Sequence, residues 1–182
     1  MNKAPYPTSR EAVETIAEYL KEITGNFRFP TAVQDGDETL TLKAPEVFRM
    51  RLPDSKSPKK VAPYIIVRLT TGIDKQVPGN RTESTCVLRL IFAVYSPDEQ
   101  EGAMMLLELI DTVKAAILRD VVIGGRFKID KDAGIEYIIY EEDTAPFYAG
   151  EMMLTVEYAA IERSVNYGFN EEENYSFHAF ET

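Results

Sequence analysis

The sequence is poor in the side chains on which most enzyme and metal chemistry depends. Its 182 residues include one cysteine, Cys86, and one histidine, His178. A single cysteine excludes an intrachain disulfide and favours a reducing compartment. Cys86 lies in an apolar strand pattern with no His or Arg beside it to lower the pKa of the thiol. We therefore expect a buried, structural cysteine.

Motifs for catalysis and metal binding are also missing. There is no Cys-x-x-Cys or His-x-x-x-His pair, no Gly-x-Ser-x-Gly elbow and no glycine-rich phosphate loop. Gly124 and Gly125 follow a predicted helix, so they are interpreted as its C-terminal cap. The carboxylates of Asp130 and Asp132 are interpreted as solvated turn groups. No catalytic residue, metal site or cofactor is predicted, and an enzyme is not expected.

Long apolar runs are absent as well. No stretch approaches the ~20 apolar residues that a membrane span needs, and MNKAPYPTSREA lacks the apolar region of a signal peptide. We therefore expect no membrane association. Acidic residues outnumber basic ones by 30 to 20, which gives a net charge of −10. A surface of this sign opposes binding to nucleic acid and to anionic membranes.

Basic side chains concentrate in one segment of this acidic chain. They lie in the loop-rich region 26–62, which otherwise shows only a short strand pattern at 39–43: Arg49, Arg51, Lys56, Lys59 and Lys60. Such a run usually faces water as a solvated loop. The more specific, functional interpretation is a basic docking loop that binds an acidic partner surface or a phosphate backbone.

The last residues of the chain, 164–182, form an acidic tail with aromatic side chains. The tail holds four glutamates and no basic residue, with five interspersed aromatic residues: Tyr167, Phe169, Tyr175, Phe177 and Phe180. Disordered segments hold few aromatics. We therefore expect the tail to fold against its own domain or against a neighbouring chain.

The first helix is predicted over about 9–24. Thr8 as the N-cap and Glu11 three residues later form a capping box, and Gly25 follows the last turn. The apolar residues of one face recur at helical spacing: Val13, Ile16, Ala17 and Leu20. This helix is expected to pack by one side only.

Strands are predicted from residue 64 onward. Residues 64–70 are apolar at odd positions, which indicates one buried face, and 72–81 is interpreted as a loop. Residues 86–95 are apolar on both faces except at Arg89, which predicts a central strand covered on both sides. Three further strands are predicted at 126–130, 135–142 and 151–163.

A long helix is predicted behind the central strand. Ser96 as N-cap, Pro97 at the first helical position and Glu99 form a second capping box. One face suits packing on the sheet: Leu106, Ile110, Val113 and Ile117. A second apolar edge, beside Asp111, needs cover from residues 26–62 or from another subunit: Met104, Leu107 and Leu118.

The order of these elements predicts one α+β domain over 1–163. A mostly antiparallel single sheet is packed by two helices, and the core spans 62–163. The tail 164–182 lies outside this domain.

Three segments together resemble a known family. PYIIVRLTTG, VLRLIFAVYSPDEQEGAMMLLELIDTVKAAIL and YEEDTAPFYAGEMMLTVEYAAIER resemble tail terminator proteins of long-tailed bacteriophages, the class of the phage lambda tail terminator. Minor tail proteins of prophages from Gram-positive bacteria look especially similar. The likeness covers roughly 62–163 and includes a turn with Pro146, Phe147, Tyr148 and Gly150.

The resemblance implies a structural virion protein in the phage tail, assembled in the host bacterial cytoplasm. Copies would form a homo-oligomeric, hexameric ring that caps the tail tube, ends its polymerisation and joins the head connector or neck protein. DNA would pass through an acidic lumen without specific binding. Interface residues are then expected among Arg89, Phe147, Tyr148, the second helix edge with Asp111, and the acidic cluster Glu141, Glu142 and Asp143.

Two alternatives stay open. A neck or head-completion protein of the virion would also be a small α+β subunit that forms rings. A small ligand-binding domain or enzyme would have to use Glu141, Glu142 and His178, since these are the least unsuitable residues for it. These possibilities differ in a measurable property. A virion protein of either kind is expected to form an assembly, whereas a ligand-binding domain or enzyme is expected to be a monomer with a deep pocket.

Overall fold

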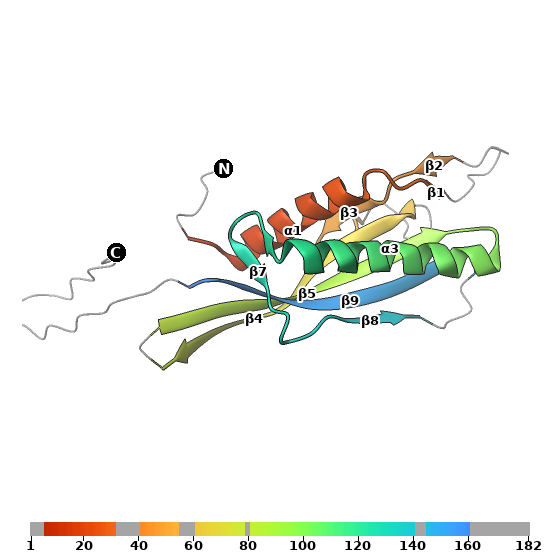
Figure 1. Ribbon diagram of the computed structural model, residues 1–182. Coiled ribbons are helices and arrows are strands. Elements are labelled where there is room, and N and C mark those ends of the chain that lie inside the picture. Colours follow the sequence, from red (N-terminus) through yellow and green to blue (C-terminus); the bar gives the residue numbers. More distant parts are fainter. Residues whose placement is uncertain (1–5, 32–40, 55–60, 79–80, 141–144, 161–182) are drawn as a thin grey trace, which may run out of the picture.

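The computed structural model describes residues 6–31, 41–54, 61–78, 81–140 and 145–160 (Figure 1). In chain order the helices and strands are α1 (Ser9–Thr24), β1 (Phe29–Pro30), β2 (Leu42–Lys43), β3 (Glu46–Arg49), β4 (Tyr64–Val77), β5 (Arg81–Tyr95), α3 (Glu99–Asp120), β6 (Val122–Ile123), β7 (Phe127–Ile129), β8 (Glu136–Ile139) and β9 (Phe147–Ala159).

The strands build a larger sheet than the sequence predicts. It has seven strands: six follow the order β3-β4-β5-β9-β7-β6, and the seventh, β8, pairs with β9 beside β7. All neighbours are antiparallel except β3 and β4, which are parallel. A separate two-stranded sheet joins β1 to β2. The α+β class with a mostly antiparallel sheet is confirmed, but the strands of the described residues form two sheets rather than one.

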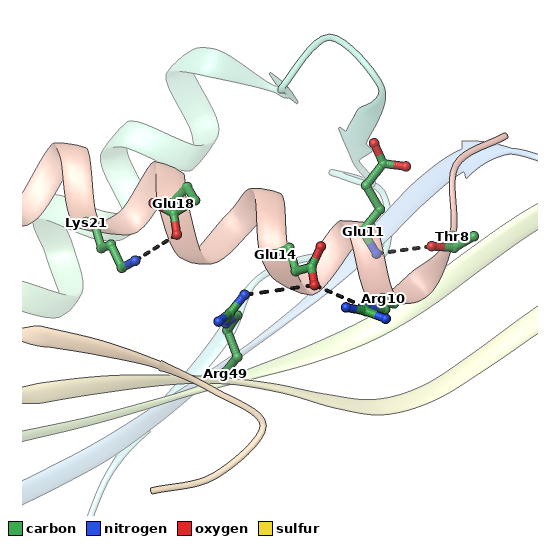
Figure 2. Close-up of polar contacts among 7 residues, drawn as sticks. All are labelled: Thr8, Arg10, Glu11, Glu14, Glu18, Lys21 and Arg49. Carbon is green, nitrogen blue, oxygen red and sulfur yellow. Dashed lines mark hydrogen bonds and ion pairs between the residues drawn. The ribbon is translucent and has the colours of Figure 1, made fainter. Parts of the chain in front are cut away.

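Helix α1 has the predicted N-terminal cap. The Thr8 hydroxyl accepts a hydrogen bond from the amide of Glu11 at 3.1 Å (Figure 2). The helix ends at Thr24, and its cap residue Gly25 keeps a right-handed φ of −61°. The predicted apolar stripe is buried, so α1 packs by one face as expected.

Helix α3 begins two residues later than predicted. Asp98 is the N-cap, and its side-chain oxygen accepts from the amides of Gln100 and Glu101, each at 3.0 Å. Ser96 is buried and instead accepts from the amide of Asp98 at 3.1 Å. The capping box at Ser96 is therefore wrong. An aspartate can accept two amides and also places negative charge at the positive end of the helix dipole.

Gly124 and Gly125 do not cap α3. The helix ends at Asp120, and the amide of its C-cap residue Val121 donates to the carbonyl of Ile117 at 3.1 Å, immediately before β6. The two glycines form the turn between β6 and β7, with φ values of 61° and 68°. This left-handed backbone favours glycine, which explains their presence better than a helix cap does.

The predicted loop at 72–81 is mostly strand. β4 continues to Val77 and pairs with β5 as far as Arg81, beyond an irregularity between Leu69 and Thr71. The distal part of this hairpin extends past the helices (Figure 1). Residues 70–76 are all exposed. Hydrophobic alternation is absent there because neither face is buried, although the backbone ladder continues.

Both helices cover one face of the seven-stranded sheet (Figure 1). Alternate residues of β5, namely Cys86, Leu88, Leu90, Phe92 and Val94, are buried in the main core with the predicted sheet-facing stripe of α3. Burial raises the pKa of the Cys86 thiol to about 11, in agreement with a structural role. None of the described helices is long and apolar enough to cross a membrane.

Candidate interaction surface

Neither α1 nor α3 lies over the opposite side of the sheet, and we call it the helix-free face (Figure 1). The intervening residues of β5 lie there, and Val87, Arg89 and Ile91 are only partly buried. The prediction that the central strand is covered on both sides is therefore confirmed for one face, while the other face is only partly covered. An antiparallel sheet with one face packed and the other toward solvent explains this pattern.

One end of the helix-free face carries a second, smaller apolar cluster. It is built on Tyr64, Ile66 and Ala93, which are buried, and it includes Phe147, whose ring lies 5.2 Å from that of Tyr95. Residues just before β4 complete it: Val61 and Ala62. Val61 and Ala62 thus cover this end of the face.

A charged network lies beside that cluster. Arg89 of β5 donates to the Glu151 carboxylate of β9, with an Nε–oxygen distance of 2.6 Å, and Tyr140 donates to the same oxygen. Burial disfavours the charged carboxylate, but the hydrogen bonds from Tyr140 and Arg89 outweigh it and hold the pKa of Glu151 below its usual value. Arg89 is therefore neutralised within its own chain and is poorly suited to binding an anionic ligand.

Two surface hollows accompany these features. One, of about 220 Å³, lies on the helix-free face beside Val87, Glu136 and Met153. The other, of about 410 Å³, lies between residues 26–29 and the Met105 region of α3. Both hollows are open to solvent, and neither brings several charged side chains together. Their walls are therefore better suited to contact with another protein surface than to catalytic chemistry.

The second apolar edge of α3 is present, and the described residues leave it largely exposed. Met104 is 59% exposed and Leu118 is 40% exposed. Leu107 is partly buried. The edge is interrupted at its middle, where Lys114 pairs with Asp111 at 2.6 Å and lies 4.7 Å from the centre of the Tyr137 ring.

The outer strand β8 is the most apolar exposed margin of the sheet. Ile138 is 50% exposed, Tyr140 39% and Tyr137 37%. Ile138 lies opposite Glu151 on the helix-free face, whereas Tyr137 lies opposite Met152 on the helix-covered face. The sequence reasoning selected the acidic cluster that follows and missed these three residues. The uninterrupted run of apolar and aromatic residues from Tyr137 to Tyr140 was the available signal.

The predicted basic loop is described only in part. Arg49 lies 3.9 Å from Glu14, which also binds Arg10 (Figure 2). Arg51 lies 4.0 Å from Asp54, and all these side chains are exposed. Contacts of this length between exposed charges are weak. Lys56, Lys59 and Lys60 lie outside the described residues.

Phe147 and Tyr148, predicted together as interface residues, lie on opposite faces. Phe147 belongs to the small cluster of the helix-free face. Tyr148 packs against the main core and its ring fills the space beside Gly102 of α3. A β-strand points successive side chains in opposite directions, so the pair cannot serve one flat surface.

The remaining predicted residues are either occupied locally or lie outside the described ranges. Asp130 accepts the amides of Asp132 and Ala133 at 2.9 and 3.1 Å, which is a turn as predicted. No group of three or more His, Cys, Asp or Glu side chains that could hold a metal ion occurs in the described part of the chain. Glu141, Glu142, Asp143, His178 and the tail 164–182 are not among the described residues.

Neither the protein-family models nor the curated proteins contain a match to this chain.

Proposed function

We propose that this protein is a structural subunit of a bacteriophage tail. Copies assemble into a ring, which caps the tail tube, ends its polymerisation and joins the tail to the head connector. The observation that carries the proposal is the amount of large apolar surface left exposed on a single α+β domain, at Met104, Leu118, Tyr137, Ile138 and Tyr140. Subunits of a permanent assembly expose such surface before they meet.

Two further features agree with this function. The three segments that resemble tail terminators map onto β4, onto β5 with α3, and onto β9 with the residues before it, which are the central elements of the fold. The net charge of −10 suits a ring around DNA, because an acidic wall repels phosphates and lets the duplex move without adhering.

The direct test is tube capping. Purified tail-tube protein is allowed to polymerise with and without the chain, and the products are measured by negative-stain microscopy. We expect added density at one tube end only and a shorter mean tube length. The chain added after polymerisation is the control and should bind ends without changing length. Tubes of unchanged length with bare ends would contradict the proposal.

A further inference from the structure

The two outer margins of the sheet differ in charge. Beside β3, four described basic residues, Arg10, Arg49, Arg51 and Arg68, lie near three carboxylates, those of Glu14, Glu46 and Asp54. Arg68 belongs to this group because its Nε donates to the carbonyl of Met50 at 2.9 Å.

The β8 margin has the opposite sign. Three carboxylates lie on or just before β8, at Asp130, Asp132 and Glu136, against one basic residue, Lys131. The ion pair of Lys114 and Asp111, beside Tyr137, adds one charge of each sign. One domain therefore has a basic margin and an acidic margin.

The two margins lie at the same position along the strand direction, as the paired residues across the sheet show. Arg49 of β3 pairs with Val67, Val67 with Leu90, Leu90 with Met152, and Met152 with Tyr137 of β8. The row crosses five strands, and four strand spacings correspond to ~19 Å. Figure 1 shows β3 and β8 on opposite sides of the sheet. A second copy shifted sideways in the same orientation therefore brings one margin against the other.

The strand directions also suit such a contact. β3 is parallel to β4, and each step from β4 to β5, to β9 and to β8 reverses direction. Three reversals leave β8 antiparallel to β3. Copies in the same orientation would thus present antiparallel margins to each other, the more common arrangement of neighbouring strands.

We propose that copies of this chain associate head to tail, with the β8 margin of one copy against the β3 margin of the next. The occupant of each margin is a second copy, selected by opposite charge and by the exposed apolar side chains of Ile138 and Met50. Met50 is 44% exposed at the end of β3. Repeated contacts of this heterologous kind form a ring when the rotation from one copy to the next closes, and an open filament when it does not. The contact belongs to the ring proposed above and rests on that proposal.

Charge reversal tests the contact in both directions. Arg51→Glu makes both margins acidic, and Glu136→Lys makes the β8 margin less acidic beside a basic partner. Each variant alone should raise the dissociation constant of self-association roughly tenfold or more, because Arg51→Glu places like charges against each other and Glu136→Lys removes the attraction between the margins. An equimolar mixture of the two variants should regain association, since each variant now meets a complementary neighbour. Analytical ultracentrifugation at low salt measures all three samples.

Matched controls come from the distal hairpin. Lys75→Glu changes an exposed charge on the same sheet, far from both margins, and should leave association unchanged. Ile138→Lys should abolish association, whereas Ile73→Lys should not, although Ile73 is 55% exposed and Ile138 is 50% exposed. Circular dichroism and the urea unfolding midpoint verify that each variant is folded.

The outcomes separate this contact from the proposed function. Wild-type chain that stays monomeric, a mixture that does not reassociate, or controls as damaging as the margin variants would overturn the contact. Capping of tail tubes could still be observed in those cases. Conversely, association that follows the charge reversals, combined with tubes of unchanged length, would retain the contact and overturn the tail function.

Discussion

The two faces of the seven-stranded sheet differ in what covers them, and β5 contributes to both. Leu88 and Leu90 are fully buried beneath the helices. Val87 and Arg89, their neighbours in sequence, lie on the helix-free face and are only partly buried. One face thus stabilises the fold through apolar burial, while the other is held by an ion pair and a small end cluster. The comparison separates residues needed for folding from residues available for contact.

The largest expected effect comes from truncating one residue on each face. Leu88→Ala should lower the free energy of unfolding by about 2–5 kcal/mol, because it leaves a cavity in the closed core. Val87→Ala, one residue away, should cost about 1 kcal/mol or less because its site is open to solvent. Urea denaturation of both variants measures the difference. Equal losses would show that the helix-free face is buried as deeply as the other.

The contact between α3 and β9 provides a second test of the covered face. A Cβ at Gly102 would lie 2.0 Å from a ring carbon of Tyr148. Gly102→Ala should therefore destabilise the protein by about 1–3 kcal/mol through overpacking, although alanine normally favours a helix over glycine.

A double-variant cycle provides its control. Adding Tyr148→Ala removes the ring, so the alanine at position 102 should then cost nothing or stabilise the protein. Additive losses in the double variant would mean that the ring does not set the requirement for glycine.

The smallest expected effect concerns Glu151 on the helix-free face. Its pKa is below the ordinary value of 4.5, so its contribution to stability is complete above that pH and is lost as the pH falls through the native pKa. Glu151→Gln should cost about 1 kcal/mol at neutral pH and progressively less in acid. Urea unfolding of both proteins between neutral pH and the native pKa measures this. A difference that does not change with pH would exclude the carboxylate charge as its source.

Local patterns were sufficient for several elements. The cap from Thr8 to Glu11 and the buried stripes of both helices agree with the structure. These features depend on residues within a few positions of each other, so the helical period is visible directly in the sequence. The strand extension to Val77 was not predictable in this way, because its side chains are exposed on both faces.

The choice of cap at α3 shows a second limit of local reasoning. Ser96 and Asp98 both precede suitable helical residues, and a capping box favoured Ser96. The structure buries Ser96 and leaves Asp98 to cap the helix. Which of two suitable residues caps the helix depends on how the preceding strand β5 enters the core. That path is a property of the tertiary structure and is not visible in the local sequence.

The sequence alone specified which side chains share a face, because the periods of two and 3.6 residues are local properties of strands and helices. It also specified the basic residues Arg49 and Arg51 and the turn carboxylates of Asp130 and Asp132. Only the tertiary structure decided that β3 and β8 lie at opposite margins of one sheet, with Arg49 and Tyr137 at the same position along the strands. Strand order depends on pairings between distant residues, such as Arg49 with Val67 and Tyr137 with Met152, and no periodicity in the sequence specifies those partners.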